Sequence, residues 1–267
     1  MKVEYSENVS RVKNKKRRKR SKAKGIIMAV CAVAVVLGVT VALMLTVFFN
    51  VAVVKVVGSS IYTADEIIYA SGIIQGDNLL RLPTETIEGR IEAALPYIKK
   101  ADIIKSYPDT AGIKVTPAVE SLIIKTNEGR FAADSDYKIL RALTEDVDDL
   151  PVIRGIVSSE VTPGKILTFD DKQQRDVLND LIKICSEKGF SVNYIDIESL
   201  INISFVIDGR LYVKLGSYND MSGKITHLAA MLETVDSNVN ASISLTEWSV
   251  DNKKAVLKYE DITDLVK

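Results

Sequence analysis

An uninterrupted apolar stretch near the N-terminus constrains this chain more than any other feature. From Gly25 to Val54 no side chain is charged, and Ile26–Phe49 is apolar almost throughout. At about 1.5 Å per residue a helix of this stretch reaches roughly 36 Å, more than the ~30 Å hydrocarbon core of a membrane. A helix in a soluble core needs a polar face, which this stretch lacks. We therefore predict a transmembrane helix over residues 25–49.

Two other kinds of apolar leader fit this stretch less well. A cleaved signal peptide has an apolar region of about 7–15 residues and a cleavage site of small residues, whereas this stretch ends in bulky Val47-Phe48-Phe49. A lipoprotein anchor needs a cysteine at the end of the run, and Cys31 lies near its start. We expect Cys31 to face lipid or another helix, and Thr40 and Thr46 to bond back to their own helix.

Charge is distributed unevenly along the chain. Lys+Arg and Asp+Glu number 35 each, yet residues 1–24 hold eleven basic side chains against only Glu4 and Glu7. A basic run directly before a span holds that end in the cytoplasm and attracts anionic lipid headgroups, which we favour over nucleic-acid binding. We predict a basic cytoplasmic tail over residues 1–24, with residues 50–267 outside the cell membrane.

The segment 50–121 predicts a small α+β module of order β-α-α-β-β. A β-branched run at 51–57 predicts a strand, and Thr63-x-x-Glu66 is a capping box that opens a helix ending at Gly72. A second helix follows Pro83-Thr84, and strands are predicted at 97–107 and 113–119. Both helices are expected on one face of a three-stranded sheet.

The segment 122–250 predicts a second mixed α+β domain, rich in antiparallel strands. Helices are expected at 171–188 and 220–235, the first placing Cys185 in the core. Strands are predicted at 122–124, 130–133, 137–140, 194–197, 203–207, 211–215, 243–248 and 256–259, with a hairpin turn at Asp208-Gly209. The acidic run 145–149 is expected to be a solvated loop.

A set of short motifs follows the basic tail and the span in a fixed order: Phe48-Phe49-x-Val51, Val54-x-Val56-x-Gly58, Thr63-x-x-Glu66-Ile67, Ser71-Gly72-Ile73-x-x-Gly76-x-Asn78-Leu79, Leu95-Pro96-Tyr97-Ile98-x-x-Ala101, Tyr107-Pro108-Asp109-Thr110-x-x-Ile113-x-Val115, Asp134, Leu150-Pro151-x-Ile153-x-Gly155 and Leu211-x-Val213-x-Leu215-Gly216. This ordered set resembles the FtsQ/DivIB family of bacterial cell-division proteins. The resemblance implies a POTRA domain at 50–121, a β domain at 122–250 and a short C-terminal tail at 251–267.

The sequence departs from that family at two places. Pro117-Ala118 stands where the family commonly has Glu-Arg, so a role tied to that pair does not transfer. The last main strand, usually Ile-Asp-Leu-Arg, is Ile243-Ser244-Leu245-Thr246 here. That difference lies at the strand where the resemblance implies a partner-binding edge.

No motif in the sequence predicts catalysis, a cofactor or a metal. Two cysteines and one histidine exclude a disulfide framework and a Cys/His zinc site. His227 is expected to be a surface or packed residue, because no nucleophile motif accompanies it. Ser135-x-x-Lys138 matches the pattern of penicillin-binding enzymes. It lies between short strand patterns instead of opening a helix, and no Lys-Thr-Gly follows.

The partner-binding edge is expected at Ser242–Trp248 with the following strand Val256–Tyr259. A partner strand adds to an exposed edge through main-chain hydrogen bonds. Trp248, the only tryptophan, is either an anchor for a partner or a cap on the core. The residues chosen as partner-binding candidates are Ser244, Thr246, Glu247, Trp248 and Tyr259.

These features predict a non-enzymatic, membrane-anchored scaffold. The resemblance implies FtsL-like and FtsB/DivIC-like single-span partners, indirect regulation of an FtsW/FtsI-type peptidoglycan synthase, and enrichment at the division septum. Two alternatives are a POTRA-bearing adaptor of a secretion or spore-assembly complex and a tethered peptidoglycan-remodelling enzyme. The second requires a nucleophile beside a base.

Overall fold

The computed structural model describes residues 24–145, 150–158, 160–235, 239–249, 251–252 and 254–265. The basic tail predicted at 1–24 therefore lies outside the described residues except for Lys24. The same holds for most of the predicted acidic loop, residues 146–149, and for the last two residues of the expected tail.

The apolar stretch forms one long N-terminal helix. It runs over Lys24–Leu43 with a mean hydropathy of 2.9 and none of it buried, and continues as a π-helical turn, η1 (Met44–Phe48). The hydroxyl of Thr40 donates to the carbonyl of Val36 at 2.8 Å, and that of Thr46 to Ala42 at 2.8 Å, which confirms that both threonines bond within their own helix. Among the described residues this is the one helix long and apolar enough to cross a membrane.

The chain divides into two compact units, each built from separated segments. The first holds the residues up to Lys55 together with 73–83 and 103–113, and the second holds 56–72, 84–102 and everything from Lys114 onward. A three-stranded sheet has the order β1-β3-β2 and is made of β1 (Val53–Val57), β2 (Ile98–Ser106) and β3 (Thr110–Pro117).

In the first unit, the residues that follow the long helix are bonded directly into the fold. Val51 is buried, donates its N–H to Asp77 and accepts from Gly76, both at 2.8 Å. Leu79 opens a short 3₁₀ turn, η2 (Leu79–Arg81), and its N–H bonds to the carbonyl of Phe49 at 2.7 Å. No flexible linker therefore separates the helix from the unit.

The second unit begins with two short helices that contact each other, α2 (Ala64–Ser71) and α3 (Thr84–Ala94). The predicted capping box is present, because Thr63 and Glu66 each accept a hydrogen bond from the other's backbone N–H. Gly72 ends α2 in the left-handed conformation, as expected of a C-terminal glycine. The predicted order β-α-α-β-β is confirmed.

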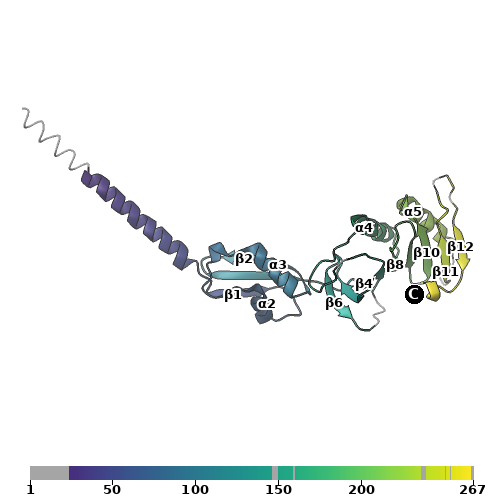
Figure 1. The fold of residues 1–267 in the computed structure, drawn as a ribbon, viewed down its shortest axis with the longest axis horizontal. Coiled ribbons are helices and arrows are strands. Elements are labelled where there is room, and N and C mark those ends of the chain that lie inside the picture. Colours follow the sequence, from purple (N-terminus) through teal and green to yellow (C-terminus); the bar gives the residue numbers. More distant parts are fainter. Residues whose placement is uncertain are drawn as a thin grey trace, which may run out of the picture. The chain divides into compact units, whose positions relative to one another are not determined.

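A nine-stranded mixed sheet forms most of the second unit (Figure 1). Its order is β12-β11-β10-β9-β8-β7-β4-β5-β6, with parallel pairing at β4–β7, β7–β8 and β10–β11 and antiparallel pairing elsewhere. The strands are β4 (Leu122–Thr126), β5 (Gly129–Ala133), β6 (Ile139–Leu143), β7 (Val152–Arg154), β8 (Val192–Asp196), β9 (Ile203–Ile207), β10 (Leu211–Gly216), β11 (Ala241–Ser244) and β12 (Val256–Tyr259).

Helices α4 (Lys172–Glu187) and α5 (Met221–Leu232) pack on the same side of this sheet (Figure 1). Each one connects a parallel pair, α4 between β7 and β8 and α5 between β10 and β11. Leu178, Cys185 and Leu228 project from the helices into a core that includes Phe205 of β9. Burial raises the pKa of the Cys185 thiol to about 12, which confirms it as a packing residue.

The opposite face of the sheet is covered by the end of the chain. Beyond β12, Ile262 packs with Tyr194 and Val206, and the turn η3 (Thr263–Leu265) follows it. Both β12 and η3 lie beyond residue 250, so the sheet continues into the range expected to be a tail.

Three predicted strand bounds were wrong. β11 ends at Ser244 instead of Trp248, and β3 ends at Pro117 instead of Val119. Tyr137, predicted to begin a strand, has a φ of +65° and lies in a turn that precedes β6. Leu245 and Tyr137 are buried in loops and Val119 is exposed, and a pattern of alternating apolar residues does not distinguish such positions from a strand.

Candidate partner-binding edge

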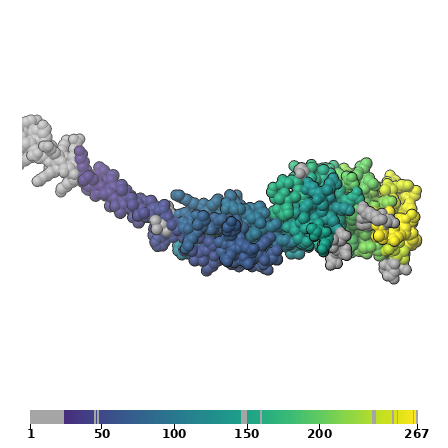
Figure 2. Space-filling model, turned by 60° about the horizontal axis from the view of Figure 1, so that its bottom comes forward, coloured from purple at the N-terminus to yellow at the C-terminus, as the bar shows by residue number. Residues whose placement is uncertain are grey.

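The open edge of the large sheet is β12. The predicted edge comprised Ser242–Trp248 and Val256–Tyr259; the strand order leaves only the second segment at the edge, since β11 lies between β10 and β12 and has neighbours on both sides. Figure 2 shows the yellow residues of the C-terminal part at the surface, beside the green of the preceding strands. A strand that joins this edge would therefore pair with β12.

The bonds that β11 makes to β10 determine which backbone N–H and C=O groups of β12 point away from the sheet. Ala241 and Leu245 donate their N–H groups to Arg210 and Lys214 of the β10 segment, at 3.1 and 2.8 Å. Backbone groups alternate along a strand, so Ser242 and Ser244 face β12, where they pair with Lys258 and Val256. The N–H and C=O groups of Leu257 and Tyr259 consequently point outward from the sheet.

The two faces of β12 differ in chemistry. Leu257 packs partly against the helix-covered core and Tyr259, 63% exposed, lies on the same face, whereas Val256, 49% exposed, shares the opposite face with Lys258. On the opposite face Glu260 forms an ion pair with Lys258 and accepts a hydrogen bond from Ser242. These two hydrogen bonds, Lys258 first, lower the pKa of the Glu260 carboxyl below its usual value. A partner strand would meet an apolar side and a charged side.

The other edge of the sheet, β6, is partly covered within the described residues. Ile139 donates to the carbonyl of Lys165 at 3.0 Å and accepts from Gly164 at 2.8 Å. Lys138 and Ile166 form an isolated antiparallel bridge in the same place. The edge of β6 therefore offers a shorter open stretch than β12.

The five predicted partner-binding residues lie in two places. Ser244 ends β11, opposite the start of β12, and its hydroxyl is 2.9 Å from that of Thr246. Glu247 forms an ion pair with Lys254 at 2.5 Å. Tyr259 lies at the other end of β12, opposite Ala241, about 10 Å away at a rise of ~3.3 Å per residue.

Trp248 follows β11 and packs partly against the core, beside α5. A Cβ at Gly223 of α5 would lie 2.7 Å from the Trp248 ring, so the glycine makes room for the indole. The buried indole Nε1 has no hydrogen-bond partner. Trp248 thus lies beside the helix surface rather than on β12, a position that strand periodicity alone did not indicate.

The remaining sequence candidates do not form a reaction centre. Lys138 Nζ donates to the carbonyls of Glu92 and Ile98, and Ser135 Oγ receives a bond from Lys99 at 3.4 Å. The described residues contain no group of three or more His, Cys, Asp or Glu side chains placed to hold a metal ion. Lys138 therefore binds main-chain carbonyls and not the Ser135 hydroxyl, which is the pairing that the Ser-x-x-Lys pattern needs.

Comparison with known proteins gives a consistent result. Residues 49–116 match the family model described as the POTRA domain, FtsQ-type. The chain is 23% identical to the cell division protein FtsQ of Streptomyces coelicolor over 182 residues, 67% of this chain and 69% of that protein. It is 32% identical to FtsQ of Streptomyces venezuelae over 117 residues, 44% and 42% of the two chains.

A relative from another bacterial group aligns over a similar length. The chain is 24% identical to the cell division protein DivIB of Clostridium acetobutylicum over 181 residues, 67% of this chain and 71% of that protein. The three alignments thus cover from 42% to 71% of the relatives' lengths.

Proposed function

We propose that this chain, which is similar to FtsQ and DivIB cell division proteins and matches the FtsQ-type POTRA family model, is a membrane-anchored, non-enzymatic scaffold of the division machinery. Its partners are other single-span division proteins, bound by strand addition. The observation that supports this best is the open edge of β12, with the backbone groups of Leu257 and Tyr259 directed outward.

The helix Lys24–Leu43 supplies the anchor. The basic residues before it hold the N-terminus in the cytoplasm beside anionic lipids, and residues 50–267 lie on the outer side of the cell membrane. Confinement to the membrane plane raises the effective concentration of partners that are anchored in the same membrane, without any new contact.

The partners that this function calls for are FtsL-like and FtsB/DivIC-like proteins at the division septum. Through them the scaffold regulates an FtsW/FtsI-type peptidoglycan synthase. Tyr259 contacts the added strand, and Ser244, Thr246 and Glu247 flank its end near Val256. Trp248, beside α5, contacts the partner where its chain leaves the edge.

Photo-crosslinking in growing cells tests the proposed partners. A photoreactive amino acid replaces Tyr259 in the full chain, and the matched control carries it at Lys183, an exposed position on α4. We expect single-span division proteins to be captured from position 259 and not from position 183. Capture of secretion or spore-assembly proteins alone at position 259 would replace the division scaffold with the adaptor alternative.

Protease treatment of intact protoplasts tests the orientation. We expect added protease to digest everything C-terminal to the span and to leave an epitope at the N-terminus intact. A protected C-terminal portion would contradict the proposed topology.

A further inference from the structure

The loop between β5 and β6 contacts an earlier segment of the second unit. This 134–138 loop is shaped by Asp134, whose Oδ1 accepts hydrogen bonds from the backbone N–H groups of Asp136 and Lys138, both at 2.9 Å. The loop lies against residues 92–99, the end of α3 and the start of β2, which we term the α3–β2 corner.

Lys138 is the central contact of this joint. Its side chain is buried, with 5% of the residue exposed, and its ammonium donates to the carbonyls of Glu92 at 2.8 Å and Ile98 at 2.5 Å. Glu92 belongs to the last turn of α3, where carbonyls lack partners within the helix and the helix dipole favours a cation. One ammonium thereby ties the helix end to the first residue of β2.

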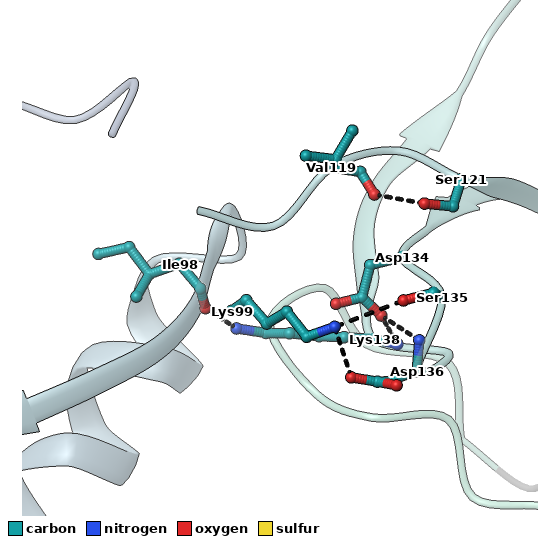
Figure 3. A network of polar contacts seen from close by, with 8 residues as sticks. All are labelled: Ile98, Lys99, Val119, Ser121, Asp134, Ser135, Asp136 and Lys138. Atoms are coloured by element: carbon teal, nitrogen blue, oxygen red, sulfur yellow. Dashed lines mark hydrogen bonds and ion pairs between the residues drawn. The ribbon is translucent and has the colours of Figure 1, made fainter. Parts of the chain in front are cut away.

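A second lysine makes the reverse connection. Lys99 of the corner reaches the loop, where it forms an ion pair with Asp136 at 2.7 Å. Figure 3 shows the Lys99 and Lys138 side chains alongside each other and pointing in opposite directions. Asp134 is only 2% exposed and adds negative charge near both ammonium groups, which offsets the cost of placing two cations side by side.

Close packing and a short connector limit the joint further. Gly164, which bonds to β6, has a φ of +86°, and a Cβ there would lie 2.1 Å from the carbonyl oxygen of Ala93. Tyr97 donates its hydroxyl to Glu120 at 2.6 Å, and Arg141 of β6 binds the same carboxylate at 2.7 Å. Only four residues, 118–121, connect β3 to β4.

We propose that this joint makes the α3–β2 corner and the large sheet move as one rigid body, with Lys138 as the residue that holds them together. Polar contacts between parts of a chain normally permit relative motion. Opening this joint, however, would leave the buried Lys138 ammonium without its carbonyl partners. Because an unpaired buried charge costs free energy, small displacements are resisted. A displacement imposed on α2, α3 or the start of β2 is transmitted to the large sheet. The inference does not depend on which partner binds β12.

Distance measurements between two spin labels test this coupling in the full chain in lipid nanodiscs. The labels replace Tyr69 of α2 and Lys183 of α4, both exposed, in a Cys31→Ser background; Cys185 is buried and stays unlabelled. We expect one narrow distance distribution. Lys138→Met should broaden it about twofold or more, because the joint then loses its one buried ammonium and keeps only the weaker contacts and the connector.

Lys99→Met is the matched control, since its ion pair is exposed and contributes little. It should leave the distribution narrow. A Lys138→Met protein with the wild-type distance distribution would overturn the proposal. A broad distribution in the unsubstituted chain would overturn it as well, and that measurement does not depend on the folding of any variant. Native amide protection in β9 of Lys138→Met distinguishes uncoupling from unfolding.

Discussion

Proline at position 259 should weaken partner binding while leaving the fold intact. The N–H of Tyr259 points away from β11, so its loss removes no bond from the sheet, and proline is tolerated on edge strands whose N–H faces outward. Tyr259→Pro should therefore unfold at nearly the same urea concentration as the wild type. Lys258→Pro, whose N–H faces β11, should lower the free energy of unfolding by about 1–3 kcal/mol.

The expected loss of affinity follows from the same bond. An added strand would leave one carbonyl without a donor opposite Tyr259→Pro, which costs about 1–3 kcal/mol, or roughly 5- to 150-fold in Kd. Tyr259→Ala keeps the N–H and serves as the matched control. The assay is binding of purified FtsL- and FtsB/DivIC-like partners to the full chain in nanodiscs. Equal affinities for Tyr259→Pro and the wild type, or equal losses in both variants, would refute main-chain pairing at this residue.

Three further predictions concern stability and reactivity. Gly155→Ala should lower the free energy of unfolding in urea more than Gly189→Ala does. Both glycines have a positive φ, which costs an alanine about 1–2 kcal/mol. A Cβ at position 155 would also lie 2.2 Å from a backbone nitrogen that follows β8, whereas a Cβ at position 189 would meet no atom within 4 Å. The hydrogen bond from Arg141 lowers the pKa of Glu120, so its stabilisation, at most about 1 kcal/mol, is present above the unfolded pKa and lost as pH falls through the folded one. Urea midpoints of Glu120→Gln and wild type should therefore differ at neutral pH and converge as the pH falls below the folded pKa of Glu120; a constant difference would contradict this. Cys185 should react with maleimide only after unfolding, and rapid labelling of the native chain would contradict its burial.

Features set by neighbouring residues were predictable from the sequence. The capping box at Thr63 and Glu66 and the end of α2 at Gly72 depend on a few adjacent residues. The hairpin at Asp208-Gly209 is another such feature, because both residues take a positive φ, as a tight turn between twisted strands requires. The apolar stretch was equally clear, since a helix that crosses a membrane needs no information from elsewhere in the chain.

Features set by distant residues were not predictable. The side-by-side position of β10 and β11 depends on α5 crossing over the sheet, which leaves β12 at the edge. A strand pattern gives the faces of a strand and not its neighbours, so the β11 segment was predicted at the edge together with β12. The burial of Lys138 could not be predicted either, because the carbonyls that it binds lie about 40 residues earlier in the chain.

Residue-resolved hydrogen exchange of β12, with and without the partner proteins, tests strand addition most directly. In the free chain the amides of Val256 and Lys258 should be protected by β11, while those of Leu257 and Tyr259 exchange freely. Partner binding should slow exchange at Leu257 and Tyr259 by roughly tenfold or more and change Val256 and Lys258 much less. Unchanged exchange at Leu257 and Tyr259 in a saturated complex would contradict the proposal that partners bind by extending this sheet.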